Sequence, residues 1–151
     1  PGGLPGLEVL LPLMATYGVA DGRITWSDLV RVMAANPAKI YNLWPRKGCL
    51  LPGSDADVVI YDPAPETVIR EEEQAAKINL SSQPPLQIFR EGEESYPICP
   101  HTIAGYSPYE GMRINGRVVT TIRRGEVLIH EGVFRGKRGN GQFIKRAAYQ
   151  T

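Results

Sequence analysis

Histidine is scarce in this sequence. His101 and His130 are the two histidines among 151 residues, and neither has a carboxylate at the spacing typical of metal ligands. Because hydrolytic zinc centres are commonly built on several imidazole ligands, such a centre cannot be assembled from this sequence alone. We interpret both histidines as surface or packing residues.

Cysteine is equally rare, with Cys49 and Cys99 far apart and no Cys-x-x-Cys motif. This excludes a zinc finger and favours two reduced thiols in a cytoplasmic protein. A disulfide stays open, because it needs a geometry that a sequence does not show. The first residues also lack the charged and then apolar pattern of a signal peptide.

An excess of charge and a long apolar run are missing too. Lys and Arg number 17 against 16 Asp and Glu, a formal net charge of +1. No apolar run approaches the roughly 20 residues that span a bilayer. We therefore expect no membrane partner, and we disfavour a nucleic-acid partner because the balanced charge creates no global field.

Residues 1–44 show helical periodicity. Apolar side chains recur at i, i+3, i+4 and i+7, which is typical of one buried helix face: Leu7, Leu10, Leu11 and Met14. Pro12 is expected to kink or shorten this helix, and Gly18 is expected to end it.

Two more helices are expected before residue 44. The second follows Gly22, with Thr25 or Ser27 as its N-cap. Asn36-Pro37 is typical of an N-cap followed by proline at the first helical position, so it predicts a short third helix over residues 38–43.

Short strands follow. Asp57–Tyr61 is rich in β-branched residues and ends at Asp62-Pro63, which predicts a buried strand with residues 67–69 as its neighbour. Residues 78–108 are aperiodic and rich in proline, which indicates an extended loop or insertion, with a possible short strand over residues 86–89.

A β-meander is predicted after this loop. Asn115-Gly116 stands between residues 112–114 and 117–122, and Asn-Gly is the strongest short hairpin signal. Arg124-Gly125 and Glu131-Gly132 mark further turns, so we expect three or four antiparallel strands. Helices followed by such a meander predict an α+β fold.

The usual catalytic patterns are weak. Asp55 and Asp57 do not begin a twelve-residue calcium loop, and Ser81, Ser82 and Ser107 lack a nucleophile elbow. These residues predict no active site.

The segment from 135 to 146 combines glycines with five basic residues: Arg135, Lys137, Arg138, Lys145 and Arg146. Such a segment could touch phosphates or RNA. An arm that docks on a partner subunit is the equal alternative, because the near-zero net charge argues against a nucleic-acid surface.

Several segments resemble, in order, the C-terminal end of one enzyme family. They are Pro1–Glu8 with Leu11-Pro12-Leu13, Gly22-Arg23-Ile24, Asn36–Ile40, Pro45–Gly48, Gly53–Pro63, Tyr106–Met112 and Gly136–Phe143. Together they resemble cyclic amidohydrolases of the hydantoinase/dihydropyrimidinase branch. Pro45–Gly48 and the glycine-rich tail favour this branch over dihydroorotase, and allantoinase remains open.

The resemblance implies a composite fold. Residues 1–44 would be the last helices of a TIM-type β/α barrel. Residues 45–134 would supply C-terminal strands of a β-sandwich, with a loop insertion at about 71–105. Residues 135–151 would form a basic, glycine-rich C-terminal arm.

The resemblance also implies hydrolysis of cyclic amide C–N bonds at a two-metal centre, usually zinc. The family's metal ligands lie upstream of Pro1, so no catalytic residue, metal ligand or cofactor is assigned to this chain. Pro1, Gly2 and Gly3 match a family loop near the substrate. Many relatives have Asn in place of Gly2, so we expect backbone contacts there.

We therefore expect an inert fragment, and the ring substrate and its stereochemistry stay open. Unpaired sheet edges predict a homo-oligomer or a second chain that completes the fold. Arg135, Lys137, Arg138 and Phe143 are the candidate contacts of the arm. The alternative is a non-catalytic assembly module of the dihydropyrimidinase-like type.

Overall fold

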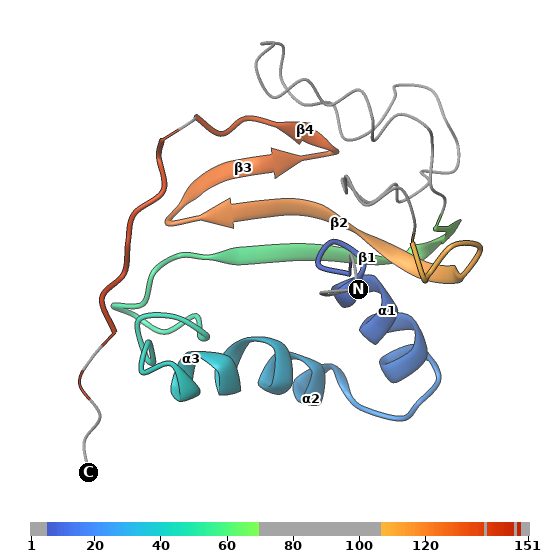
Figure 1. Ribbon diagram of the computed structural model, residues 1–151, viewed down its shortest axis with the longest axis horizontal. Coiled ribbons are helices and arrows are strands. Elements are labelled where there is room, and N and C mark those ends of the chain that lie inside the picture. The colour runs from blue at the N-terminus through green and yellow to red at the C-terminus, as the bar shows by residue number, and fades with distance from the viewer. Residues whose placement is uncertain (1–5, 70–106, 138, 147, 149–151) are drawn as a thin grey trace.

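The computed structural model describes residues 6–69, 107–137, 139–146 and 148. An N-terminal helical region precedes a four-stranded antiparallel sheet with the order β1-β2-β3-β4. Figure 1 shows the helices on the β1 side of the sheet and the extended C-terminal arm crossing the ends of the strands. The expected α+β class is confirmed.

The first helix continues past Gly18, where the sequence predicts its end. α1 (Leu10–Met14) continues directly into the π-helical η1 (Ala15–Ala20), so the prediction that Gly18 ends the helix is wrong. A Cβ at Gly18 would lie 2.9 Å from Cδ1 of Ile24, which explains the glycine by packing. The chain leaves the helix at Gly22, where φ is +70°. Pro12 lies in the first turn of α1, where its missing N–H costs no helical hydrogen bond.

The second helix begins at the predicted cap. Thr25 Oγ1 accepts a hydrogen bond of 3.1 Å from Asp28 N, and Thr25 N donates one of 3.1 Å to Asp28 Oδ2. This reciprocal pair is a capping box, and it confirms Thr25 rather than Ser27 as the N-cap. The hydrogen bond from Arg31, followed by those from Thr25, lowers the pKa of Asp28 from 3.8 to about 2.

No separate third helix forms. α2 (Trp26–Val30), the π-helical η2 (Arg31–Ala35) and α3 (Asn36–Ile40) follow one another without a break. Asn36 has helical angles, φ −65° and ψ −46°, so the prediction that it is an N-cap is wrong. The wider π turn before Pro37 relieves the clash that a proline ring makes with the carbonyl four residues earlier.

The sheet consists of β1 (Val58–Val68), β2 (Arg113–Arg123), β3 (Glu126–His130) and β4 (Val133–Phe134). The predicted meander is confirmed, but its strands differ from the prediction. Residues 57–61 and 67–69 are predicted to form neighbouring strands, and this prediction is wrong. The two segments fall at opposite ends of the single strand β1, and both ends pair with β2.

Asn115-Gly116 lies inside β2, so the hairpin predicted there is wrong. The register of β1 against β2 jumps from Asp62–Arg117 to Glu66–Asn115, which is a bulge on β1. A Cβ at Gly116 would lie 2.5 Å from the Asp62 carbonyl oxygen, and φ there is +89°. The glycine therefore permits close approach of two strands.

The hairpins occur at the two other predicted turns. Arg124 and Gly125 have φ values of +49° and +80°, and Glu131 and Gly132 have +46° and +74°. Positive φ at both central residues is the type I′ pattern that matches the twist of antiparallel strands. Both turn predictions are confirmed.

The hydrophobic core is small and lies at one end of the sheet. Val9, Ile69 and Ile114 are fully buried, and they are surrounded by Leu13, Tyr17, Tyr109 and Met112. The other end of β1 is open: Val59 and Ile60 are each 50% exposed, so the predicted buried strand over residues 57–61 is not buried in this chain. No helix in the described ranges is long and apolar enough to cross a membrane.

Candidate functional site

The residues expected near a substrate cannot be placed. Pro1, Gly2 and Gly3 lie outside the described residues, together with Arg138 and residues 70–106. This last range contains His101, Cys99, Ser81, Ser82 and the insertion expected at about 71–105.

The described part of the chain holds no group of three or more His, Cys, Asp or Glu side chains able to hold a metal ion. These residues therefore do not fit a two-metal centre. We derive no hydrolytic step from them.

Three reactive side chains in the described ranges have structural contacts. His130 Nδ1 lies 3.0 Å from Thr120 Oγ1 on the neighbouring strand. Ser107 Oγ accepts a hydrogen bond of 3.2 Å from Tyr109 N in the turn before β2. Cys49 Sγ donates to the Pro45 carbonyl oxygen at 3.1 Å. Each contact fixes a turn or a strand pair.

A charged cluster fastens the loop between α3 and β1. Lys47 Nζ lies 2.9 Å from Asp55 Oδ2 and also forms an ion pair with Asp57. Arg46 Nε donates to Asp55 Oδ2 at 3.1 Å. Asp57 Oδ1 accepts a hydrogen bond of 2.8 Å from Arg124 N, which joins the loop to the β2–β3 turn. The two carboxylates are thus engaged by protein cations.

The pKa values in this cluster follow from these contacts. Hydrogen bonding to Lys47 holds the pKa of Asp55 below its ordinary value. Desolvation raises the pKa of Asp57, but the hydrogen bonds with Lys47 and Arg124 N outweigh it, so this pKa is also lowered. Desolvation lowers the pKa of Lys47, and the hydrogen bonds with Asp57 and Asp55 reverse that effect, so its pKa is raised. All three groups are charged at neutral pH.

The C-terminal arm is the other feature at this end of the sheet. It leaves β4 through a hydrogen bond of 2.7 Å from Arg135 N to the Leu128 carbonyl oxygen. Farther along, Asn140 binds the β2–β3 turn, and the Ala148 carbonyl oxygen accepts a bond of 3.3 Å from Asn42 Nδ2. The arm therefore crosses from the last strand to the end of α3 (Figure 1).

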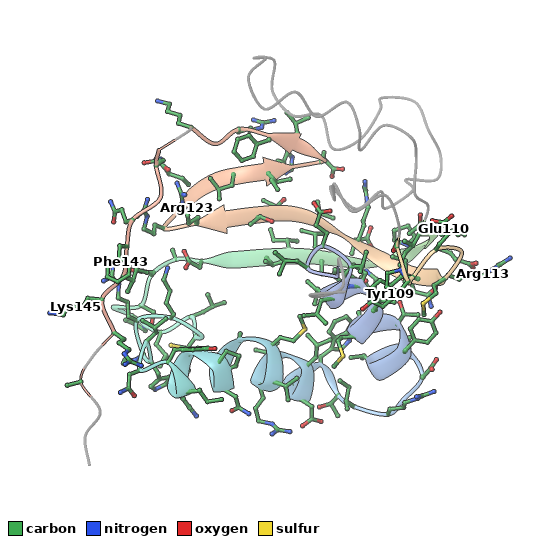
Figure 2. All side chains as sticks on the ribbon, in the orientation of Figure 1. Tyr109, Glu110, Arg113, Arg123, Phe143 and Lys145 are labelled. Carbon is green, nitrogen blue, oxygen red and sulfur yellow. The ribbon has the colours of Figure 1, made fainter. Side chains whose placement is uncertain are left out.

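The aromatic side chain of Phe143 on the arm lies in solvent. Phe143 is 95% exposed, and Figure 2 shows it with Lys145 along the outer edge of the molecule. Arg135 and Lys137 are exposed as well. The structure thus places these three proposed contacts on one extended segment. The sequence gives no signal that the Arg124 guanidinium binds the Asn140 carbonyl oxygen, because the two residues lie in separate segments of the chain.

Large apolar side chains are also exposed on the helices and on the loop before β1. Trp26, Val30, Ile40, Tyr41, Leu50 and Leu51 are all more than 40% exposed. Exposed apolar area on this scale is typical of a surface that another protein segment covers.

Comparison with known proteins gives a consistent result. A model of the amidohydrolase family matches residues 6–128. The D-phenylhydantoinase of Escherichia coli O139:H28 is 38% identical over 149 residues, which are 99% of this chain and 27% of that protein. The chain thus spans about a quarter of the length of the curated relatives that it matches.

Solved structures agree. A D-hydantoinase structure superposes with a TM-score of 0.73 and 33% identity, over 100% of this chain and 27% of its own. The L-hydantoinase (dihydropyrimidinase) from Arthrobacter aurescens gives a TM-score of 0.72 and 33% identity, over 93% of this chain and 26% of its own. These likenesses confirm the resemblance inferred from the sequence.

Proposed function

Because the chain belongs to the amidohydrolase family, we propose that it is a C-terminal portion of a cyclic amidohydrolase of the hydantoinase/dihydropyrimidinase type. In this proposal, residues 1–44 cover the outside of a β/α barrel, and β1–β4 belong to a β-sandwich. The observation that supports it best is the likeness to D-phenylhydantoinase along almost the whole chain. The enzyme as a whole would hydrolyse a cyclic amide C–N bond in the cytoplasm.

The part assigned to this chain is non-catalytic. Its described residues do not fit a metal centre, so zinc and its ligands belong, in this proposal, to the remainder of the enzyme. Pro1, Gly2 and Gly3 would approach the substrate through their backbone. The chain by itself would be inert.

The apolar surface supports association with more protein. Val59 and Ile60 on β1 and Leu50 and Leu51 on the preceding loop are at least 50% exposed. Covering such side chains yields about 25 cal/mol for each Å² removed from water. We propose that a second copy, or a chain that completes the fold, covers them.

The arm is the proposed contact between subunits. Phe143 buries almost none of its ring on its own chain, and aromatic and arginine side chains are enriched where proteins meet. Arg135, Lys137 and Arg138 would surround this aromatic contact. The nearly balanced net charge favours a protein partner over nucleic acid.

Two measurements test the proposal. With added zinc, the chain should turn over neither hydantoin nor dihydrouracil, whereas an intact hydantoinase assayed beside it should. Size-exclusion chromatography with light scattering should give a mass above the 16.6 kDa of one chain. Turnover by the chain alone would overturn the non-catalytic assignment, and a clean monomer would contradict the assembly.

A further inference from the structure

The guanidinium of Arg123 has two donors without an acceptor in the part of the chain that the structure describes. Arg123 ends β2, as Figure 2 shows, and its side chain is 27% exposed. Its Nε and Nη2 are shielded from solvent and find no hydrogen-bond partner among the described residues. These two nitrogens form one side of the guanidinium fork, which binds a carboxylate in bidentate fashion. Buried donors left in this way cost free energy, so a carboxylate within reach is drawn toward them.

Glu126 is such a carboxylate. It lies across the β2–β3 turn, with its Oε2 3.8 Å from Arg123 Nη2, which is too long for a hydrogen bond. The same oxygen accepts a hydrogen bond of 3.0 Å from Asn140 Nδ2 on the arm. A movement of about 1 Å toward Arg123 would make a charge-assisted bond of normal length. The arm and Arg123 thus compete for one carboxylate.

We propose that Glu126 is a two-position latch for the C-terminal arm. In the held position, Asn140 binds Glu126 through its side chain and accepts a bond of 2.9 Å from Arg124 Nη2 through its carbonyl oxygen. In the released position, Glu126 closes on the Nε and Nη2 of Arg123, and residues 139–146 leave the sheet. The latch goes beyond the proposed function and does not depend on hydrolysis.

The two positions are balanced by their contacts. The held position has two hydrogen bonds between Asn140 and the β2–β3 turn, and the released position replaces them with two at Arg123, both to an ionised group. Phe143, 95% exposed, loses almost no burial when the arm leaves. Arg135 N stays bonded to the Leu128 carbonyl oxygen in both positions, so the arm pivots there. Release also breaks the hydrogen bond of 3.3 Å from Asn42 Nδ2 to the Ala148 carbonyl oxygen. It therefore costs one exposed hydrogen bond beyond this exchange, and a partner that binds the arm could draw the arm out.

Backbone heteronuclear 15N NOE values for residues 141–146 of the full chain test the latch. Arg123→Met removes the fork, so the released population should fall about threefold to tenfold and the NOE values should rise. Asn140→Ala removes the competing amide and should change both quantities in the opposite direction. Arg23→Met makes the same charge change as Arg123→Met at an exposed side chain in the loop before α2, and it should leave the values unchanged.

A double-substitution experiment isolates the role of Glu126. In a Glu126→Gln background, Arg123→Met should no longer alter the NOE values, because the shared carboxylate is gone. If Arg123→Met does not fold, Arg123→Lys replaces it, since lysine keeps the charge and loses the fork. Unchanged or lower NOE values in the Arg123 variant, or an effect that persists in the Glu126→Gln background, would overturn the latch.

Discussion

The two ends of β2 are held by different forces. At its beginning, Ile114 is fully buried with Val9 and Ile69. Thr16 Oγ1 accepts a bond of 2.8 Å from Asn115 N, so the first helical region is locked to this end. At its other end, Arg123 faces Glu126 of the β2–β3 turn, and Glu126 binds Asn140 of the arm, through polar groups that are partly open to solvent. Burial therefore keeps the first helical region packed on the beginning of β2. The arm is held to the other end by polar groups, which can exchange one hydrogen-bond partner for another.

The largest effect is expected in the core. Ile114→Ala should lower the free energy of unfolding by about 2–5 kcal/mol, because it removes buried methyl groups and leaves a cavity. Urea denaturation measures this loss. Val59→Ala, at a side chain 50% exposed on β1, is the control and should cost less than about 1 kcal/mol. Equal costs would mean that the two ends are not packed differently.

The bulge should be the next most sensitive point. Gly116→Ala should cost about 2–3 kcal/mol, because it adds a Cβ close to the Asp62 carbonyl oxygen at a positive φ. Gly125→Ala tests positive φ alone, since φ is +80° there and nothing among the described residues lies within 4 Å of an added Cβ. It should cost about 1 kcal/mol, as measured by thermal or urea unfolding. If the two variants were equally destabilised, close approach at the bulge would be refuted.

The third largest loss of stability is expected at the hydrogen bond between Thr16 and Asn115. Thr16→Val keeps the shape of the side chain but leaves Asn115 N without its acceptor, which should cost about 1–2 kcal/mol. Thr16→Ser restores the oxygen and should recover most of this loss in the same unfolding assay. A valine variant as stable as the serine variant would show that burial alone holds the helix to β2.

Acidification should produce the smallest effect and act on the cluster that binds the β2–β3 turn. The pKa values of Asp55 and Asp57 are lowered in the folded chain, so their stabilisation is present above their ordinary value of 3.8 and is lost as pH falls below it. The raised pKa of Lys47 adds stabilisation that is lost above its ordinary value of 10.5. NMR titration should therefore show the Arg124 amide, which donates to Asp57 Oδ1, shifting as the pH falls below 3.8. An Arg124 amide that does not respond to this acidification would contradict the assignment of polar contacts to this end.

Local signals in the sequence predicted local structure well. Thr25 is the cap of its helix, and Arg124-Gly125 is a type I′ turn, because each feature is decided by residues within one turn of chain. Equally strong local signals predict the wrong conformation at three places, which are Gly18, Asn36-Pro37 and Asn115-Gly116. In these cases a neighbouring side chain, a π-helical turn or a second strand decided the conformation.

The candidate functional surface was predictable in part. The basic, glycine-rich composition of residues 135–146 indicated an arm, and exposed Phe143 is consistent with that expectation. The competition of Asn140 and Arg123 for Glu126 could not be predicted, because the three residues belong to separate elements and none has an unusual neighbour in the sequence.

The sequence by itself determined the family, the order of helices before strands, and the turns that glycine and a capping threonine specify. These properties depend on residue identity and on steric effects between residues close together in the sequence, so they can be predicted before the fold is known. Only the tertiary structure decided that β1 runs through a bulge past Gly116, that the core gathers at one end of β2, and that the arm reaches Glu126. Each of these depends on contacts between residues distant in the chain, whose free energy exists only once the chain has folded.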